Sequence, residues 1–240
     1  MPLYTIADLH LSLGENTDKP MEIFGARWQD HHNKIKERWS SLVEKNDTVI
    51  IPGDISWALK LEEAAEDFRF IDSLPGKKII SKGNHDFWWS TQNKITGFFA
   101  AHKIESIDIL YNNAFKVEDT LICGTRGWYN EQSASPRPCD YEKISARECG
   151  RLERSILAAK ALCDGESLPL VAFTHFPPIW KDFAFEELVD VMKAHGVAKC
   201  YYGHIHGVYN CPAVQEYKGI RFELISADFI DFTPRRIFIP

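Results

Sequence analysis

The sequence lacks the features that mark several large classes of protein. Its 240 residues contain no apolar run long enough to cross a bilayer, and the N-terminus has no basic segment followed by an apolar stretch. We therefore predict neither a membrane span nor a signal peptide. There is no internal repeat and no linker rich in glycine or serine. A chain of this length without such breaks is expected to form one domain, residues 1–240, rather than two small ones.

Positive charge is also in short supply. The chain has 28 Lys and Arg residues against 34 Asp and Glu residues, which gives a formal net charge of −6. An acidic surface repels phosphate backbones and anionic lipids, so nucleic acid and membranes are disfavoured as partners. A local basic groove is still compatible with this charge, and the sequence leaves the oligomeric state open.

Closely spaced cysteine pairs are absent as well. The six cysteines form no CxxC motif and no tight framework, which is typical of reduced thiols in a cytosolic protein. We therefore predict a cytoplasmic location, and we expect most of these cysteines to be small buried hydrophobic residues.

Short apolar runs alternate with longer amphipathic ones along most of the chain. The apolar runs predict buried strands, and the amphipathic runs, with apolar residues three or four positions apart, predict helices. The predicted strands are 3–7, 48–51, 78–80, 121–123, 170–174 and 199–202, and the predicted helices are 35–43, 61–71 and 140–163. This alternation indicates an α/β fold.

The last part of the chain follows a different pattern. Residues 213–217, 220–225 and 236–239 read as strands joined by short turns, so part of the sheet is expected to be antiparallel. The Lys-Gly pair at 218–219 would supply the first turn. The polar stretch 129–140 contains two prolines and no apolar pattern, which predicts a surface loop.

Polar side chains fall at the ends of five predicted strands, and glycines frame several of them. In an open α/β sheet, ligands bind beyond the carboxyl ends of the strands, and glycine there allows tight turns and close backbone approach. We therefore expect these polar side chains to converge at one edge of the sheet. They are Asp8, His10, Asp54, Asn84, His85, Asp86, His175, His204 and His206.

The residue types in this set suit a metal centre. Carboxylates, one amide oxygen and several imidazoles favour Mn²⁺, Fe or Zn²⁺, whereas a site for Mg²⁺ or Ca²⁺ alone would be all oxygen. The set is too large for one ion, and a carboxylate shared by two ions about 3.5–4 Å apart would account for the surplus. Each piece alone is common in turns or in a hydrogen-bonded core, but the joint pattern argues for a functional site.

The sequence resembles the signature of the calcineurin-like metallophosphoesterase superfamily in five blocks that occur in the family's order. The blocks are Asp8-Leu9-His10, Gly53-Asp54, Gly83-Asn84-His85-Asp86, His175 and Gly203-His204-Ile205-His206. The resemblance implies a sandwich of two mixed β-sheets flanked by α-helices. It also implies two divalent metal ions, bridged by Asp54. One ion would be bound by Asp8, His10, Asp54 and His206, and the other by Asp54, Asn84, His175 and His204.

One departure from the family pattern narrows the expected activity. Protein Ser/Thr phosphatases of this superfamily continue the second block as Gly-Asp-x-x-Asp-Arg-Gly, whereas this chain has Trp57 and Ala58 in place of the second Asp and the Arg. This argues against a protein phosphatase. It also leaves open what orients His85, because the adjacent Asp86 can point elsewhere.

The resulting prediction is a dinuclear metal-dependent phosphoesterase that hydrolyses a small-molecule phosphomonoester or phosphodiester. A hydroxide bridging the two ions would attack phosphorus. The resemblance implies that His85 contacts the phosphate without binding metal, and as a general acid it would protonate the leaving oxygen. A nuclease acting on DNA or RNA is the alternative, and a non-catalytic scaffold of the same fold ranks last because every ligand position is filled.

Three further residues give clues to the substrate. Trp57 and Trp128 follow predicted strand ends, where aromatic side chains can stack on a base or pack against an apolar leaving group. Arg126 could contact phosphate with two hydrogen bonds. For each Trp, packing in the core is an equal alternative. For Arg126, the equal alternative is a surface position with no role in binding. The loop 12–27 emerges beside Asp8 and is expected to shape the pocket.

Overall fold

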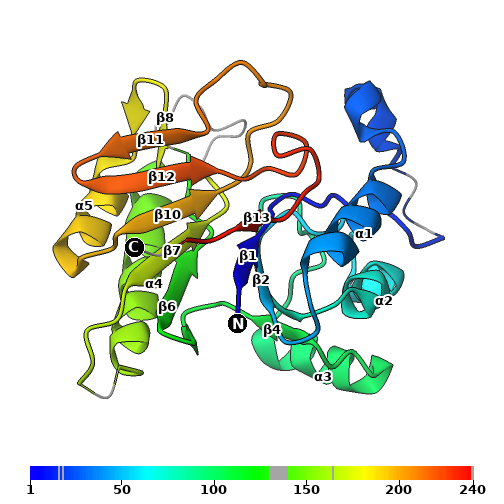
Figure 1. The fold of residues 1–240 in the computed structure, drawn as a ribbon, viewed down its shortest axis with the longest axis horizontal. Helices are drawn as coiled ribbons and strands as arrows, with labels where there is room; N and C mark the ends of the chain where they lie inside the picture. The colour runs from blue at the N-terminus through cyan, green and yellow to red at the C-terminus, as the bar shows by residue number, and fades with distance from the viewer. Residues whose placement is uncertain (16, 18, 130–139, 164, 239–240) are drawn as a thin grey trace.

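Two β-sheets face each other between two groups of helices in the computed structural model (Figure 1). The structure describes residues 1–15, 17, 19–129, 140–163 and 165–238. This is the α/β sandwich of mixed sheets that the family resemblance implies, so the predicted fold class is confirmed. Cys139, and the predicted surface loop except for its two end residues, lie outside the described residues.

The first sheet contains the N-terminal strands, in the order β13-β1-β2-β3-β4. Four strands are parallel, and the short β13 pairs with β1 in the antiparallel direction. The strands are β1 (Leu3–Thr5), β2 (Thr48–Pro52), β3 (Lys77–Ser81), β4 (Ile107–Ile109) and β13 (Arg235–Arg236). The helices beside this sheet are α1 (His31–Leu42), α2 (Ala65–Ser73) and α3 (Gln92–His102), with 3₁₀ turns η1 (Met21–Phe24), η2 (Ala26–Trp28) and η3 (Leu61–Ala64).

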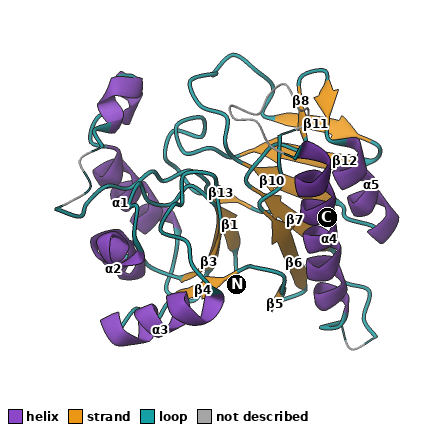
Figure 2. Ribbon diagram, turned by 180° about the vertical axis from the view of Figure 1, so that it is seen from behind, coloured by secondary structure: helices purple, strands orange, loops and turns teal. Residues whose placement is uncertain are grey.

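The second sheet has the order β11-β12-β10-β7-β6-β5. Its four inner strands are parallel and its two edge strands are antiparallel to their neighbours. The strands are β5 (Phe115–Val117), β6 (Thr120–Thr125), β7 (Leu170–Thr174), β10 (Lys199–Tyr202), β11 (Val214–Tyr217) and β12 (Ile220–Leu224). Helices α4 (Tyr141–Lys160) and α5 (Glu186–His195) lie beside this sheet (Figure 2), and β8 (Ile179–Trp180) pairs with β9 (Phe183–Ala184).

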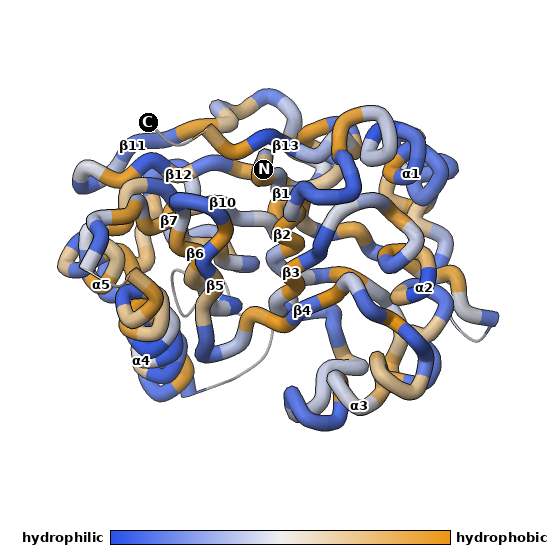
Figure 3. Tube along the Cα trace, turned by 60° about the horizontal axis from the view of Figure 1, so that its bottom comes forward, coloured by the Kyte–Doolittle hydropathy of each residue, from blue (hydrophilic) through white to orange (hydrophobic). Residues whose placement is uncertain are grey.

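The inner strands of the second sheet are apolar because both of their faces are buried. Val171 and Phe173 of β7 join the core shared with the first sheet, whereas Leu170 and Ala172 join the core under α4 and α5. Successive side chains of a strand point to opposite faces, so one strand contributes to both cores. Figure 3 shows hydrophobic residues concentrated along the strands between the helices. Continuous apolar runs are therefore expected here, as in other strands buried on both sides.

The sequence-based boundaries agree with the structure for the central strands and fail at short elements. The strands 170–174 and 199–202 are as predicted. The hairpin turn at 218–219 is also confirmed, with both residues at positive φ, as a type I′ turn requires. The first strand ends at Thr5 rather than residue 7. The sequence analysis did not identify α3, α5 or the strands β4, β5, β8 and β9.

No helix among the described residues is long and apolar enough to span a membrane. The five cysteines in the described part of the chain are free thiols, and Cys123 and Cys200 are fully buried. Burial raises the pKa of the Cys200 thiol to about 12, so this side chain is a neutral packing residue.

Candidate metal centre and active site

The polar side chains predicted to converge do come together, but from two sheets instead of one. Asp8, Asp54 and Asn84 follow strands of the first sheet, whereas His175 and His204 follow β7 and β10 of the second. The expectation of one edge of one sheet was therefore wrong. The site lies where the carboxyl ends of parallel strands from both sheets meet.

The backbone at the site adopts conformations that L-residues seldom use. Asp8, His10, Asp54 and His204 have φ values of 61°, 46°, 49° and 71°. A left-handed conformation costs a non-glycine residue about 1–2 kcal/mol, and such strain is typically concentrated at functional sites. Backbone hydrogen bonds stabilise it here, since the amides of Asp8 and His10 donate to the carbonyls of Gly53 and Asp54 at 3.0 Å each.

Glycines permit the close approach of the two buried carboxylates. A methyl group on Gly83 would overlap the Asp54 side chain, and a methyl group on Gly203 would overlap the Asp8 carboxylate. Gly83 directly precedes Asn84, and Gly203 directly precedes His204. The lack of a side chain therefore lets the backbone bring Asn84 close to Asp54 and His204 close to Asp8.

One group of potential metal ligands surrounds His10. Its Nε2 atom lies 3.1 Å from Nε2 of His206 and 3.7 Å from Oδ2 of Asp54, and His206 Nε2 lies 3.7 Å from Oδ1 of Asp8. Atoms bound to a common ion at about 2.0–2.2 Å are roughly 3–3.6 Å apart. One of the three distances falls in this range and the other two exceed it by only 0.1 Å, so the group is close to the spacing of a metal site.

A second group surrounds the amide oxygen of Asn84. Oδ1 of Asn84 lies 2.6 Å from Nε2 of His175 and 2.9 Å from Nδ1 of His204. The two imidazole nitrogens are 3.2 Å apart, and His175 Nε2 is also 3.5 Å from Oδ2 of Asp54. The same Asp54 oxygen thus faces both groups.

These contacts fit a cation better than they fit hydrogen bonds. No placement of the ring protons satisfies all three contacts. If both imidazoles donate to Asn84, their two N–H groups confront each other; if only one donates, the lone pair of the other ring nitrogen faces the amide oxygen; if neither donates, three lone pairs converge. A cation that receives all three lone pairs removes the conflict. The buried Nδ1 atoms of His10 and His175 also lack a hydrogen-bond partner among the described residues.

The charge states point the same way. Burial lowers the pKa of His204 to about 3, with added repulsion from His206 and His85, so its imidazole is neutral and can act as a ligand. Burial raises the pKa of Asp8 to about 6. Burial also raises the pKa of Asp54, helped by the neighbouring charges of Asp86 and Asp8. Nearby divalent cations would stabilise these carboxylates in their charged form.

Asp228, which was not among the residues predicted from sequence, orients a predicted ligand. His206 Nδ1 lies 2.8 Å from Oδ1 of Asp228, and the other carboxylate oxygen accepts from the Gly207 amide and the Tyr209 hydroxyl, each at 3.0 Å. Burial alone would lower the pKa of His206, but Asp8 and the bond to Asp228 raise it. A carboxylate on the far ring nitrogen is the usual support of a metal-bound imidazole.

Asp86 does not orient His85. Its carboxylate accepts hydrogen bonds from the amides of Gly83 at 2.7 Å and Asp54 at 3.0 Å, and from Trp88 Nε1 at 3.0 Å. Asp86 therefore fixes the two loops that carry Asp54 and Asn84.

His85 is positioned by its backbone and by Trp57. Its amide donates to Oδ1 of Asp54 at 2.7 Å, and its ring centroid lies 4.4 Å from that of Trp57. Trp57 also stacks on His10, with centroids 4.9 Å apart and planes at 22°. The residue that replaces the second Asp of the phosphatase motif thus packs against both imidazoles.

An apolar cavity opens beside the His10 group. Its volume is about 300 Å³, and the predicted pocket-shaping loop contributes Met21 and Phe24, of which Phe24 is 54% exposed. Trp28, which the sequence analysis also missed, forms part of the wall. The lining of this apolar cavity is His10, Met21, Phe24, Trp28, Trp57, His85, His206 and Gly207.

The other two predicted substrate residues lie elsewhere. Trp128 packs edge-on against Phe176, with centroids 5.4 Å apart, and it does not line the apolar cavity. The Arg126 guanidinium stacks over Trp128, 4.7 Å from the ring centroid, and lines a separate pocket. Trp57 and Trp128 therefore do not form one common wall.

A model of the calcineurin-like phosphoesterase family matches residues 1–208. Similar solved structures include the protein of unknown function AQ665 from Aquifex aeolicus, at 15% identity and a TM-score of 0.54 over 98% of this chain and 95% of that one. Another is the phosphopantetheinyl hydrolase PptH from Mycobacterium tuberculosis, at 14% identity and a TM-score of 0.54, with coverage of 100% of this chain and 98% of that one. No curated protein matches the chain. At these identities the two likenesses show the fold alone.

Proposed function

The chain belongs to the calcineurin-like phosphoesterase family, and from this premise we propose that it hydrolyses a small-molecule phosphomonoester or phosphodiester with two divalent metal ions. The observation that carries this proposal is the place of Asp54 Oδ2, which lies 3.7 Å from His10 Nε2 and 3.5 Å from His175 Nε2. One carboxylate oxygen that faces both groups of ligands is what a bridged pair of ions requires.

The mixed donors favour Mn²⁺, Fe or Zn²⁺. Asp8, His10, Asp54 and His206 would hold one ion, and Asp54, Asn84, His175 and His204 the other. When bound, the two ions would lower the pKa of a water and neutralise charge on the phosphate oxygens. The protein itself supplies a rigid set of ligands. Asp86 fixes the two loops that carry Asp54 and Asn84, and Asp228 fixes the imidazole of His206.

We assign His85 to the phosphate and not to metal. Burial lowers the pKa of its imidazole to about 4, with further repulsion from His206 and Lys19, so His85 is neutral at pH 7 in the free protein. A phosphate group beside it would raise this pKa again, because a nearby anion favours the protonated form. His85 would then donate a hydrogen bond to the phosphate and a proton to the leaving oxygen.

The apolar cavity indicates the kind of group next to the phosphate. Trp57 is half-buried in its wall, and Phe24 lies exposed at its rim. Apolar pockets with a few polar groups are typical of small-molecule sites. A flat or apolar group on the substrate would pack there while its phosphate reaches His85, and we propose a substrate with such a group.

A substrate panel on the manganese-loaded protein tests the proposed function. We expect turnover of p-nitrophenyl phosphate, bis-p-nitrophenyl phosphate or a cyclic nucleotide, no cleavage of single-stranded DNA, and loss of turnover in the Asp54→Asn variant. Cleavage of DNA alone would identify a nuclease. Metal binding without turnover of any substrate would identify a non-catalytic member of the family.

A further inference from the structure

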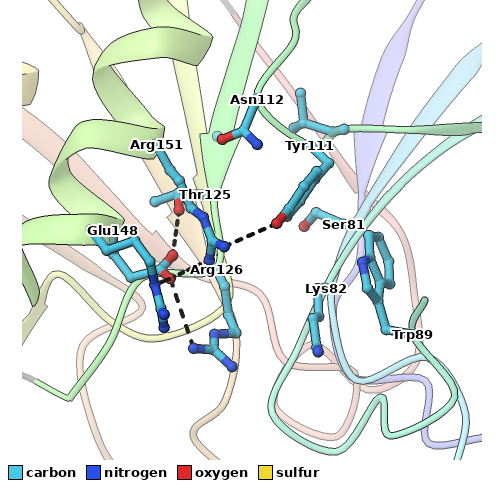
Figure 4. A pocket seen from close by; sticks show the side chains of 12 residues that line it. Ser81, Lys82, Trp89, Tyr111, Asn112, Thr125, Arg126, Glu148 and Arg151 are labelled. Carbon is cyan, nitrogen blue, oxygen red and sulfur yellow. Dashed lines mark hydrogen bonds and ion pairs between the residues drawn. The ribbon is translucent and has the colours of Figure 1, made fainter. Parts of the chain in front are cut away.

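A second pocket, which we call the cationic pocket, lies at the carboxyl ends of β3, β4 and β6 and against α4. Its volume is about 180 Å³, several times the ~30 Å³ that one water occupies in the liquid. Figure 4 shows Lys82 and Arg126 on opposite sides of it, with Tyr111 above. The lining is Ser81, Lys82, Trp89, Leu110, Tyr111, Asn112, Gly124, Thr125, Arg126, Arg147, Glu148 and Arg151.

Positive charge in this pocket exceeds negative charge, although the protein as a whole is acidic. Lys82, Arg126, Arg147 and Arg151 face a single carboxylate, that of Glu148. Glu148 is fully buried and is already satisfied, since it accepts from Thr125 Oγ1 at 2.7 Å and from Arg151 Nη1 at 2.6 Å. Neutralisation by protein groups is therefore incomplete.

Three of the four cations keep donors available for a ligand, and one of them is Arg147, which approaches Glu148 only to 3.9 Å. Arg151 is committed, because it also donates to the Tyr111 hydroxyl at 2.9 Å. Arg126 approaches Glu148 only to 3.8 Å, and its buried Nε has no hydrogen-bond partner among the described residues. Lys82 is half-buried and forms no ion pair with the residues that the structure describes.

The cationic pocket adjoins the Asn84 group of ligands through the backbone. Lys82 is two positions before Asn84, and the carbonyl of Arg126 accepts from the amides of His175 at 3.1 Å and Phe176 at 2.9 Å. The apolar cavity instead adjoins His10 and His206, and the two cavities share no lining residue. They therefore adjoin different groups of ligands.

We propose that the cationic pocket binds a second phosphate group of the substrate, separate from the one that is hydrolysed. This inference rests on the proposed phosphoesterase function. A guanidinium can contact phosphate through two parallel hydrogen bonds, and a lysine ammonium acts as a point charge beside it. A ligand carboxylate carries one negative charge and would therefore neutralise less of this positive charge than a doubly charged phosphate would. The substrate class is a bisphosphorylated small molecule with an apolar or aromatic part.

Lys82→Met is the variant that tests the proposal. It removes the cation that has no ion pair and keeps the length of the side chain, whereas removal of Arg151 would leave the buried Glu148 poorly paired and destabilise the fold. The matched control is Lys143→Met, because Lys143 is exposed on the same helix as Arg151 and does not line the pocket.

The measurement is the ratio of KM values for a nucleoside 5′-monophosphate and the matching 3′,5′-bisphosphate, with the manganese-loaded enzyme. We expect the native protein to prefer the bisphosphate and Lys82→Met to reduce this preference about tenfold, which corresponds to the loss of one charge-assisted contact. Lys143→Met should keep the preference. The proposal is overturned if the native protein shows no preference or if Lys82→Met behaves as the control does.

A calorimetric titration separates this inference from the proposed function. If neither nucleotide is hydrolysed, both are titrated into the manganese-loaded protein. Tighter binding of the bisphosphate that weakens about tenfold in Lys82→Met would support the pocket even though hydrolysis fails. Equal binding of the two nucleotides would refute it.

Discussion

The apolar cavity and the cationic pocket differ in the properties that govern recognition. The first has a volume of about 300 Å³ and aromatic walls that include Trp28 and Trp57. The second has a volume of about 180 Å³ and is lined by four basic side chains, among them Lys82 and Arg126. The first adjoins the His10 group of ligands, and the second adjoins the Asn84 group. The difference indicates that unlike parts of a substrate are recognised separately around one reaction centre.

The largest expected effect comes from changing Asp54, the residue that the two groups of ligands share. Asp54→Asn removes the negative charge of the carboxylate that faces both groups of ligands. We therefore expect loss of both metals and of nearly all turnover. The loss should be equal for bulky and small substrates, and for substrates with one or two phosphate groups. Elemental analysis and kcat/KM values test this. Native metal content with native turnover would exclude a bridging role for Asp54.

His85→Ala is expected to have the next largest effect. His85 is proposed to contact phosphate and to protonate the leaving group, so the variant should keep its metals and lose roughly 10²–10⁴-fold in kcat for alkyl esters. The loss should be smaller for p-nitrophenyl esters, whose leaving group needs little protonation. Equal losses for both esters would argue against the acid role, and loss of metal would make His85 a ligand.

Asp228→Asn distinguishes the two groups of ligands. Asp228 supports His206 in the group beside the apolar cavity and has no contact with the Asn84 group. We expect metal affinity at one of the two sites to fall about 10–100-fold while the other site stays filled. A titration with Mn²⁺ should then change from two tight sites to one. Equal weakening of both sites would show that Asp228 acts on the whole cluster.

The central strands and the nine polar residues at strand ends could be predicted from sequence for one physical reason, whereas the choice of seven ligands among the nine came from the family resemblance. Strands buried on both faces are continuous apolar runs, and the polar residues that follow them stand out. The same rule would have found Asp228, which follows β12. It was missed because the C-terminal strands were read as antiparallel, whereas β12 is parallel to β10 and delivers its carboxyl end to the site.

The cationic pocket could not be predicted in the same way. Lys82 and Arg126 follow strands of different sheets, and Arg147 and Arg151 lie on α4. Their proximity depends on how the two sheets and the helix pack. Basic residues on a helix commonly lie on its solvent-exposed face, so Arg147 and Arg151 alone do not indicate a pocket. For Arg126 the sequence therefore left a surface location as an equal alternative, which the structure does not support, since its side chain is 18% exposed.

The smallest expected effect is that of Trp57→Ala, which tests whether the apolar cavity recognises the substrate or only packs. Trp57 is half-buried, stacks on His10, and its Nε1 lies 3.1 Å from the sulfur of Met21. We expect KM for a diester with a bulky aromatic group to rise about 5–10-fold, consistent with the ~1–3 kcal/mol measured for stacking of a base on an aromatic side chain. KM for a small alkyl phosphate should change much less.

The control for Trp57→Ala is Trp180→Ala. Trp180 is also half-buried, but it packs against the core under α4 and α5 and does not line the apolar cavity. It should lower Tm without changing the dependence of KM on substrate bulk. If Trp57→Ala behaves in the same way, the cavity is a packing defect and only the cationic pocket carries specificity. If instead the KM effect depends on bulk while the preference for a bisphosphate is kept, the two cavities act independently, as sites without shared partners generally do.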